Sequence, residues 1–314
     1  MVFKNITIII PVFNDEEVLK ELQSRLQIML NENHYQYKII FIDDGSTDNS
    51  WNIITELQNN DSNICGLKLL RNFGQQNAIA AGLDYAEGDV VVIMDSDLQD
   101  KPEDIPKLIS ALEENDASMA IAKWIRRKDS FCKKFVSKLF YSVSQKITNL
   151  HYELGLGVFR AIRGEVVEEL KKYNEKTSTP ISLLYWIGVD YVTVPLERDA
   201  RFAGKSGYNL HKMLKLSMDR IFSFSMFPIR ASIYSGIIIS LLSFTLAIIF
   251  IIRRIMNLVA PGWTSIVVIV LFLFGINFIF LGVIGEYLGR VFIETRQRPK
   301  YIVKSVVGDI CKKL

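Results

Sequence analysis

The stretch VVVIMDSDLQDKPE (residues 90–103) decides the fold, because a run of apolar, β-branched residues ends directly in two carboxylates. Its first part, Val90–Met94, has the length and composition of a buried strand. Similar apolar runs recur through the first 122 residues, and helical patterns separate them. We expect strands at 6–12, 37–42, 65–70, 89–94 and 118–122, and helices at about 15–31, 48–60, 75–86 and 102–115. Strands that alternate with helices predict an α/β fold with a mostly parallel, Rossmann-like sheet.

Polar residues follow four of these strands at the point where each one ends. They are Asn14-Asp15-Glu16 after the first strand, Asp43-Asp44-Gly45-Ser46 after the second, Arg71-Asn72 after the third and Asp95-Ser96-Asp97 after the fourth. The carboxyl ends of parallel strands share one edge of the sheet, which is where such sheets bind ligands. We therefore expect a ligand site at this edge.

The Asp-Ser-Asp turn (residues 95–97) carries the chemistry expected at that edge. Two carboxylates one residue apart can hold a divalent cation that also bridges a diphosphate, and Gln99 adds a further oxygen. These ligands suit Mg²⁺ or Mn²⁺. Acidic residues also occur in ordinary turns, so this motif alone does not identify an enzyme. In the same way, Asp48 or Thr47 could cap the helix after the second strand, while Asp43 binds a base or ribose.

The composition separates a polar first part of the chain from an apolar last part. Hydrophobic residues make up 49% of the 314 residues, and most of the excess lies after residue 230. The net charge of +3 is too small to indicate a nucleic-acid partner. The three cysteines have no paired spacing, so we expect neither a disulfide framework nor a zinc site, and a reducing, cytosolic setting. The N-terminal apolar run is too short for a signal peptide and fits a first strand better.

Two uncharged stretches near the C-terminus are long enough to cross a membrane. They cover residues 231–252 and about 264–285, and basic residues flank the pair on both sides. The alternative is that both stretches are buried helices of a soluble protein. That alternative poorly explains two such apolar runs in succession. The bias of the basic residues predicts that the segments before and after the pair, and both termini, are cytosolic.

These patterns divide the chain into four parts. We expect a cytosolic catalytic domain at 1–208, an amphipathic juxtamembrane helix at 209–229, the two membrane helices within 230–286 and a cytosolic tail at 287–314. The juxtamembrane segment has basic residues between apolar ones, which suits either a membrane surface or packing on the domain. A second basic, amphipathic stretch covers residues 123–150. It could form either an ordinary solvated surface or a helix that lies against the membrane.

Several segments together resemble the family 2 glycosyltransferases of GT-A fold. They are PVFNDEE (11–17), IDDGSTD (42–48), RNFGQQNAIAAGLDYA (71–86) and MDSDLQDKPE (94–103). Three more are similar to the polyprenyl-phosphate glycosyltransferases with two C-terminal spans: RFAGKSGY (201–208), FSFSMFPIR (222–230) and LGVIGEYLGRVFIETRQRPKYIV (281–303). That group includes bactoprenol glucosyltransferases and dolichol-phosphate mannose synthases. The resemblance covers nearly the whole chain, and its C-terminal segment is the most specific part.

The resemblance implies a role for most of the polar residues at the sheet edge. The implied nucleotide-binding residues are Pro11, Phe13, Glu16, Asp43, Ser46, Arg71 and Asp95. The implied ligands of Mg²⁺ or Mn²⁺ are Asp95, Asp97 and Gln99, and the implied catalytic residues are Asp97, Arg201 and Lys205. In this scheme Asp43 contacts the base, and Arg201 reaches a phosphate of the donor or acceptor, which suits the fork of a guanidinium.

Three positions depart from the pattern of the resembling enzymes. Many of them carry Asp at the second position of the string GVFR (157–160), where this chain has Val158. Some carry Arg at the position of Trp124. The Lys expected in the RFAGxSKY segment falls at Gly207, although Lys205 is close enough to substitute. These departures bear on sugar recognition and positioning more than on the reaction itself.

The implied reaction needs little help from a general base. The second pKa of a phosphate monoester is about 6, so a polyprenyl phosphate is largely ionised at neutral pH. It can attack the anomeric carbon in line and invert it, with positioning and charge stabilisation as the main contributions of the enzyme. Glu153 lies a few residues upstream of Val158 and could replace the missing carboxylate.

We therefore expect an inverting glycosyltransferase that moves glucose from a UDP-linked donor to undecaprenyl phosphate at the cytosolic face of the inner membrane. N-acetylglucosamine, mannose and aminoarabinose are the alternative sugars. A hydroxyl-directed glycan or glycolipid synthase is the alternative reaction, although the sequence lacks the Gln-x-x-Arg-Trp motif of processive synthases. A non-catalytic scaffold with a degenerate donor site is a third hypothesis. The resemblance also implies a homotetramer, and we expect a downstream flippase as a partner.

Overall fold

The computed structural model describes residues 3–124, 156–197, 222, 225, 227–256 and 262–309 of the 314-residue chain. Its contacts group the chain into two units. The sheet unit comprises Met1–Tyr141, Leu150–Asn209 and Arg298–Leu314, and the helical unit comprises Ser142–Asn149 and Leu210–Gln297. The C-terminal residues therefore fold with the N-terminal ones, although the helical unit separates them in the sequence.

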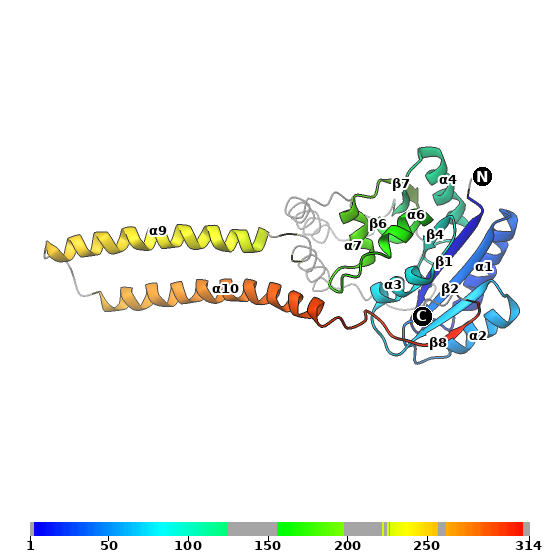
Figure 1. The fold of residues 1–314 in the computed structure, drawn as a ribbon, viewed down its shortest axis with the longest axis horizontal. Coiled ribbons are helices and arrows are strands. Elements are labelled where there is room, and N and C mark those ends of the chain that lie inside the picture. The colour runs from blue at the N-terminus through cyan, green and yellow to red at the C-terminus, as the bar shows by residue number, and fades with distance from the viewer. Residues whose placement is uncertain are drawn as a thin grey trace. The chain divides into compact units, whose positions relative to one another are not determined.

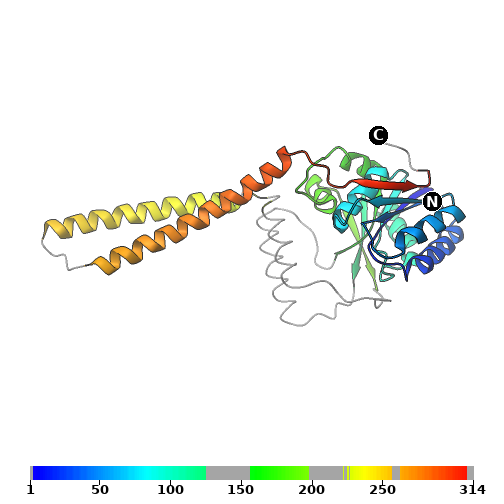
Figure 2. The ribbon, with the colours of Figure 1, turned by 90° about the horizontal axis from the view of Figure 1, so that it is seen from below.

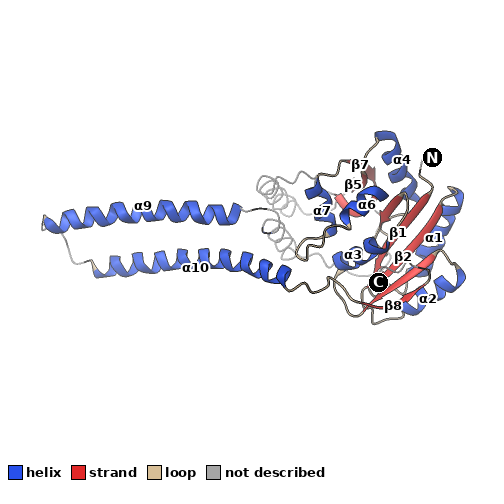
Figure 3. Ribbon diagram, viewed as in Figure 1, coloured by secondary structure: helices blue, strands red, loops and turns tan. Residues whose placement is uncertain are grey.

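An eight-stranded sheet forms the centre of the sheet unit (Figures 1 and 3). In spatial order its strands are β7 (Tyr191–Leu196), β5 (Met119–Trp124), β6 (Leu156–Arg163), β4 (Val90–Ile93), β1 (Asn5–Val12), β2 (Gln36–Asp43), β3 (Ile64–Leu69) and β8 (Val303–Val307). The strands β4, β1, β2 and β3 are parallel neighbours, and β5 pairs in parallel with β7. β6 and β8 run antiparallel to their neighbours. The predicted mostly parallel sheet is confirmed.

Helices cover both faces of this sheet. One face is covered by α1 (Leu19–Glu32), α2 (Ser50–Asn60) and α4 (Ile105–Asn115), which the 3-10 helix η1 (Pro102–Asp104) precedes. The other face is covered by α3 (Gln75–Tyr85) and α6 (Gly164–Leu170), with α7 (Pro180–Ile187) packed against them. Since both faces are buried, β1 reads NITIIIPV, without the alternation of a half-exposed strand.

The side chains of β1 divide between these two faces. Ile8 and Ile10 belong to the hydrophobic cluster that includes Leu22 of α1. Ile9 points the opposite way, where a Cβ added to Gly82 of α3 would collide with its side chain. A glycine at this position thus lets α3 lie close to β1, with the first residue of α3 near the carboxyl ends of the strands.

Three strands of the sheet, β6, β7 and β8, have no counterpart in the sequence prediction. The segment 287–314, expected as a tail, contains the end of a long helix and then β8, which pairs antiparallel with β3 at the sheet edge (Figure 2). In β8 only alternate residues are half-buried, which is a weak pattern over five residues. α1 also begins later than the predicted residue 15, because a turn in which Val18 bonds back to the carbonyl of Asp15 precedes it.

The described part of the helical unit consists mainly of two long apolar helices, α9 (Phe227–Ile255) and α10 (Trp263–Thr295), which lie side by side (Figures 1 and 2). By length and composition, Phe227–Leu246 and Phe272–Thr295 could each cross a membrane, and neither is buried within the protein. Both helices extend past the predicted limits of 231–252 and 264–285. The segments 209–229 and 123–150, predicted as amphipathic, lie largely outside the described residues.

Candidate active site

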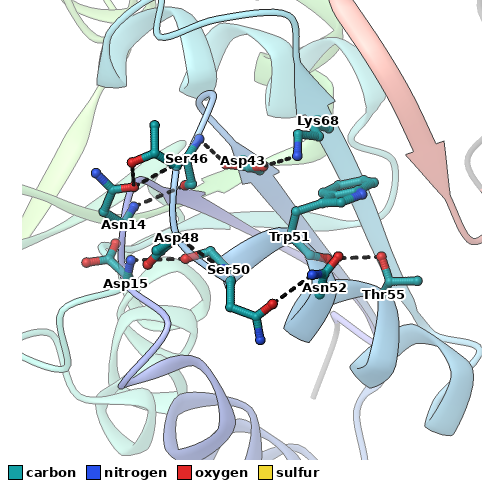
Figure 4. A network of polar contacts seen from close by, with 12 residues as sticks. Asn14, Asp15, Asp43, Ser46, Asp48, Ser50, Trp51, Asn52, Thr55 and Lys68 are labelled. Atoms are coloured by element: carbon teal, nitrogen blue, oxygen red, sulfur yellow. Dashed lines mark hydrogen bonds and ion pairs between the residues drawn. The ribbon is translucent and has the colours of Figure 1, made fainter.

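A turn at the end of β1 joins the ends of β1 and β2 (Figure 4). Asn14 has a left-handed backbone conformation (φ 56°), which asparagine tolerates better than most residues. Its N–H donates to Ser46 Oγ (3.0 Å), and its Oδ1 accepts the N–H of Thr47 (2.9 Å). Asn14 thereby fixes the loop that follows β2.

Asp15 connects this turn to the end of β4. Its N–H donates to Ser50 Oγ (3.1 Å), and its Oδ2 accepts the hydroxyl of Ser96 (2.5 Å) and the N–H of Phe13 (3.2 Å). Burial is the main cause that raises the pKa of Asp15; the bonds from Ser96 and Phe13 oppose the rise, and the charge of Asp97 adds to it. The serine between the two acids of the Asp-Ser-Asp turn thus ties that turn to β1.

Glu16 and Asp48 hold the start of α2. The N–H of Glu16 donates to Asp48 Oδ2 (3.1 Å), and Glu16 Oε2 accepts the N–H of Asn49 (2.8 Å). Asp48 Oδ1 accepts the N–H of Ser50 (3.0 Å). Burial alone would raise the pKa of Asp48, but the hydrogen bonds from Ser50 and Glu16 together lower it. Asn49 occupies the N-cap position in place of the expected Thr47 or Asp48, and Asp48 bonds the first turn from one position earlier.

Asp43, the last residue of β2, is fully buried (0% exposed). Its Oδ1 accepts the N–H of Ser46 (2.8 Å), and its Oδ2 lies 3.7 Å from Lys68 Nζ but has no hydrogen-bond partner among the residues that the structure describes. Lys68 Nζ also lies over the ring of Trp51, 5.4 Å from the ring centroid (Figure 4). A buried carboxylate oxygen without a hydrogen bond is a ready acceptor for an N–H or O–H group of a ligand.

Asp44 ties the loop after β2 to the loop after β3. Its carboxylate accepts the N–H groups of Phe73 (2.7 Å) and Gly74 (2.9 Å). Burial is the main cause that raises the pKa of Asp44, and these two bonds oppose the rise. The next residue, Gly45, has φ +71°, and a Cβ there would lie 2.5 Å from the carbonyl carbon of Arg71. Glycine therefore allows both the left-handed conformation and the close approach of the two loops.

The Asp-Ser-Asp turn is held from two further sides. Gln75, the first residue of α3, donates from Nε2 to Asp95 Oδ1 (2.6 Å). The N–H of Asp95 donates to Asp100 Oδ2 (3.2 Å), and the N–H of Gln99 donates to Asp97 Oδ1 (3.2 Å). The positions of both acidic side chains are thus set by neighbours within the sheet edge.

Three residues that shape this turn were not among the predicted site residues: Gln75, Asp100 and Leu98. Leu98 follows the turn directly with φ 58°, a left-handed conformation that costs a residue with a Cβ about 1–2 kcal/mol. Backbone strain of this kind is often found where a loop must hold functional groups in place. The sequence does indicate that Gln75 lies at the start of a helix, next to the expected ligand edge. Gln75 and Asp95 are far apart in the sequence, however, and nothing in it pairs them.

The acidic side chains suit a metal ion that is shared with a ligand. Within the described ranges, no group of three or more His, Cys, Asp or Glu side chains is arranged to hold a metal ion. Asp95 and Asp97 do supply carboxylate oxygens at the end of β4, the ligands that Mg²⁺ and Mn²⁺ prefer. A cation held there would take its remaining oxygens from a bound diphosphate and from water. The donor set therefore fits a divalent cation that arrives with its ligand.

The structure brings most of the predicted site residues to one edge of the sheet. Those in the loops described above are Asp43, Ser46, Asp95, Asp97 and Gln99. Phe13 (45% exposed), Glu16 and Arg71 are exposed at the same edge, whereas Pro11 is buried within β1. The predicted residues that lie outside the described part of the chain are Glu153, Arg201, Lys205 and Gly207.

Comparison with known proteins adds a family to this geometry. The family model "Glycosyl transferase family 2" matches residues 7–171. An uncharacterized glycosyltransferase of Bacillus subtilis (strain 168) is 37% identical over 309 residues, covering 98% of this chain and 96% of that protein. The bactoprenol glucosyl transferase of Shigella phage SfV is 38% identical over 302 residues, covering 96% of this chain and 98% of that protein. A solved structure of glucosyl-3-phosphoglycerate synthase from Mycobacterium tuberculosis, in complex with Mn²⁺ and UDP-glucose, aligns with a TM-score of 0.48 and 18% identity, covering 70% of this chain and 77% of that one.

Proposed function

The chain belongs to glycosyl transferase family 2, and we propose that it transfers a monosaccharide from a nucleotide donor to a polyprenyl phosphate at a membrane surface. That the protein is a glycosyltransferase follows from the family, and its mostly parallel sheet agrees with the GT-A fold implied by the sequence. The proposal concerns the identity of the donor, the identity of the acceptor and the side of the membrane on which the reaction takes place.

One observation carries the proposal: the polar loops after β1, β2, β3 and β4 form one hydrogen-bonded edge, in a chain that continues into two long apolar helices. The first feature suits a nucleotide diphosphate, because its acceptors can bind the N–H and O–H groups of the nucleoside and its carboxylates can hold a divalent cation that binds the diphosphate. These groups converge at the edge where parallel sheets bind ligands. The second feature suits an acceptor with a long hydrocarbon tail. A soluble acceptor would give no reason for the helices.

The end of β2 suits the base of the donor. Asp43 offers a buried Oδ2 without a hydrogen bond, and uracil carries an N–H donor that can supply one. Phe13 and Arg71 provide an exposed ring and an exposed guanidinium at the same edge, which suit the base and a phosphate respectively. These roles, together with those implied for Pro11, Glu16 and Ser46, suit a nucleotide, and we take UDP as that nucleotide.

Asp95, Asp97 and Gln99 would hold the diphosphate through Mg²⁺ or Mn²⁺. When bound, the cation supplies positive charge that offsets the charge developing on the leaving diphosphate. The protein keeps the two carboxylates in place through Gln75 and through the backbone of the turn.

The acceptor phosphate would bring its own nucleophile. At neutral pH it is largely ionised, since its second pKa is about 6, and attack on the anomeric carbon from the side opposite the diphosphate inverts that carbon. Arg201 and Lys205 are the residues that we expect to bind and orient this phosphate. The similarity to bactoprenol glucosyl transferases favours undecaprenyl phosphate as the acceptor and glucose as the sugar.

The reaction is tested with the full-length protein in detergent, radiolabelled UDP-glucose and undecaprenyl phosphate, with and without Mn²⁺. We expect a labelled lipid product that disappears when the metal is chelated. Asp97→Asn should lower turnover by about 100-fold or more, because it removes a charged ligand of the leaving-group site. Asp116→Asn, at an exposed aspartate that pairs with Arg163 away from this edge, is the matched control and should keep wild-type turnover.

Two outcomes would contradict the proposal. Turnover of Asp97→Asn equal to that of the wild type would exclude the assigned diphosphate site. Label transferred only to a hydroxyl of a sugar or a glycolipid, and never to undecaprenyl phosphate, would support the hydroxyl-directed synthase in its place.

A further inference from the structure

Lys68 brings a positive charge to the same edge of the sheet, and the proposed function gives it no role. It lies near the end of β3, and the parallel register of β2 and β3 pairs it directly with Asp43. The side chain of Lys68 is only 23% exposed. By comparison, the side chain of Lys20, which forms an ion pair between α1 and α2 with Glu56, is 60% exposed. A lysine that is covered as far as Lys68 needs a partner for its charge.

Asp43 is that partner, and only one of its oxygens is engaged in a hydrogen bond. Oδ1 accepts the N–H of Ser46 and so belongs to the loop after β2. Oδ2 lies 3.7 Å from Lys68 Nζ, and no donor in the described part of the chain forms a hydrogen bond with it (Figure 4). The ammonium therefore balances the charge of a fully buried carboxylate without donating a hydrogen bond to its second oxygen.

Trp51 provides a second attraction for the same ammonium. Lys68 Nζ lies over the indole of Trp51, 5.4 Å from the ring centroid, where the electrons of the ring attract a cation (Figure 4). The indole itself lies on Gly66, because a Cβ added there would be 3.3 Å from Trp51 Cζ3. It also packs against the main hydrophobic cluster. The ring is thus fixed on the sheet, and the ammonium is held between this ring and a carboxylate.

A neutral side chain at position 68 would leave the charge of Asp43 without a counter-ion. Lys68 is the cation that pairs with Asp43 within the described residues, and the next residue, Asp44, is a second buried acid. Removing one partner of a buried ion pair is far more harmful than removing one partner of an exposed pair, because the remaining charge stays buried. The carboxylate of Asp43 would then turn toward solvent or become neutral.

We propose that Lys68 is a positioning residue for the base of the donor, which balances the charge of Asp43 and keeps its Oδ2 in place to accept the ring N–H of that base. The inference rests on the proposed function, which puts the base at Asp43. A charged carboxylate accepts hydrogen bonds and cannot donate them. It therefore favours uracil, which has a ring N–H at this point, over cytosine, whose ring nitrogen at the same point is an acceptor.

The role of Lys68 is tested by titration calorimetry of the full-length protein in detergent with UDP and with CDP, each with Mn²⁺. Lys68→Met removes the charge but keeps a long side chain; it should weaken UDP binding by about tenfold and lower the ratio of UDP affinity to CDP affinity. Lys68→Gln, a second neutral variant, should do the same. Lys68→Arg keeps the charge and should retain most of the affinity and the ratio. Lys20→Met, which breaks the exposed pair with Glu56, is the matched control and should bind both nucleotides as the wild type does.

A double-mutant cycle separates positioning through Asp43 from a direct contact between Lys68 and the ligand. Asp43→Asn alone should weaken UDP binding. In the Asp43→Asn background, Lys68→Met should have little further effect, because the charge that Lys68 balances is absent. Losses that add in the double variant would show that Lys68 binds the base or a phosphate itself, and would overturn the positioning role.

The outcomes also separate this inference from the proposed function. A wild type that binds neither UDP nor CDP contradicts the proposed donor and the role of Lys68 with it. Wild-type UDP binding by Asp43→Asn contradicts the base site at Asp43. Weak UDP binding by Asp43→Asn, together with wild-type affinity and a wild-type ratio in Lys68→Met, overturns the inference alone and leaves the proposed function intact. Equal affinity of the wild type for UDP and CDP overturns the recognition of a ring N–H.

Discussion

At the scale of single residues, the loops after β2 and β3 depend on how closely their backbones approach at Gly45. The backbone there is left-handed, and Asp44 on one side accepts two N–H groups from the neighbouring loop. Asp43, the last residue of β2, accepts the N–H of Ser46 in the loop that follows this strand. A side chain at position 45 would therefore disturb both the loop after β2 and the loop after β3.

Gly45→Ala should destabilise the protein by about 2 kcal/mol or more, because it adds left-handed strain and a 2.5 Å clash with the carbonyl carbon of Arg71. We also expect weaker binding of UDP. Thermal unfolding and calorimetric titration of the same preparation measure the two effects. Gly275→Ala in α10, where an added Cβ meets no heavy atom within 4 Å, is the control; it should not destabilise the protein and should leave UDP binding unchanged. Wild-type stability of Gly45→Ala would mean that the two loops can move apart freely.

Asp15 gives a prediction for pH. Burial raises its pKa above the ordinary value of 3.8, so the folded protein holds this proton more tightly than the unfolded chain. Its contribution to the free energy of unfolding is therefore most favourable below pH 3.8 and is lost as the pH rises through the raised value. The melting temperature of the wild type should fall relative to that of Asp15→Asn between pH 4 and pH 7. The prediction is wrong if the difference in melting temperature between the two proteins stays constant across this range, or if it grows in favour of the wild type.

At the scale of elements, the C-terminal strand β8 supports the part of the sheet that carries Lys68. β8 pairs antiparallel with β3, and Lys68 of β3 is in register with Ser305. Two positions before Lys68 in β3, a Cβ added to Gly66 would lie 2.8 Å from Val307 Cγ2, so Val307 packs directly on this glycine. A segment that follows both apolar helices thus completes the sheet beside β3.

Val307→Ala should lower the free energy of unfolding by about 1 kcal/mol, because it removes methyl groups that pack against the core cluster. Val306 is 48% exposed on the opposite face of the same strand, and Val306→Ala should change stability by less than about 0.5 kcal/mol. Chemical denaturation monitored by tryptophan fluorescence compares the pair. Equal effects of the two substitutions would show that β8 does not depend on this packed face.

The elements that the sequence predicted are those with strong local patterns. The runs of β1 to β5 are apolar over most of their length, and the polar residues after β1 to β4 mark one edge of the sheet without any knowledge of the fold. β6 and β8 pair with strands far away in the sequence, and their own residues have no such clear pattern. The same distance hid the contacts that organise the site: Ser96 bonds to Asp15, and Gln75 bonds to Asp95, across 81 and 20 residues. Local composition predicts which residues are polar, whereas only the register of the sheet decides which of them meet.

At the scale of the whole molecule, the chain returns to the sheet unit after the two apolar helices. The segments Met1–Tyr141 and Leu150–Asn209, which precede the helices, and Arg298–Leu314, which follows them, belong to the same folded unit. If α9 and α10 each cross a membrane once, the sheet unit lies on a single side, and the segment between the helices lies on the other. The basic residues near the helix ends on the side of the sheet unit, Arg230, Arg290, Arg296 and Arg298, predict that this side is the cytosol.

Reporter fusions in a bacterial host test this arrangement. Green fluorescent protein attached after Leu314 should fluoresce, because it folds in the cytosol, and alkaline phosphatase at the same position should be inactive. Alkaline phosphatase inserted after Gly262, between the two helices, should be active, since that position is expected outside. The opposite pattern would reverse the orientation, whereas phosphatase that is inactive at both positions would mean that the helices do not span the membrane. Because β8 must reach β3 for the sheet to be complete, an orientation with the termini on opposite sides is incompatible with this fold.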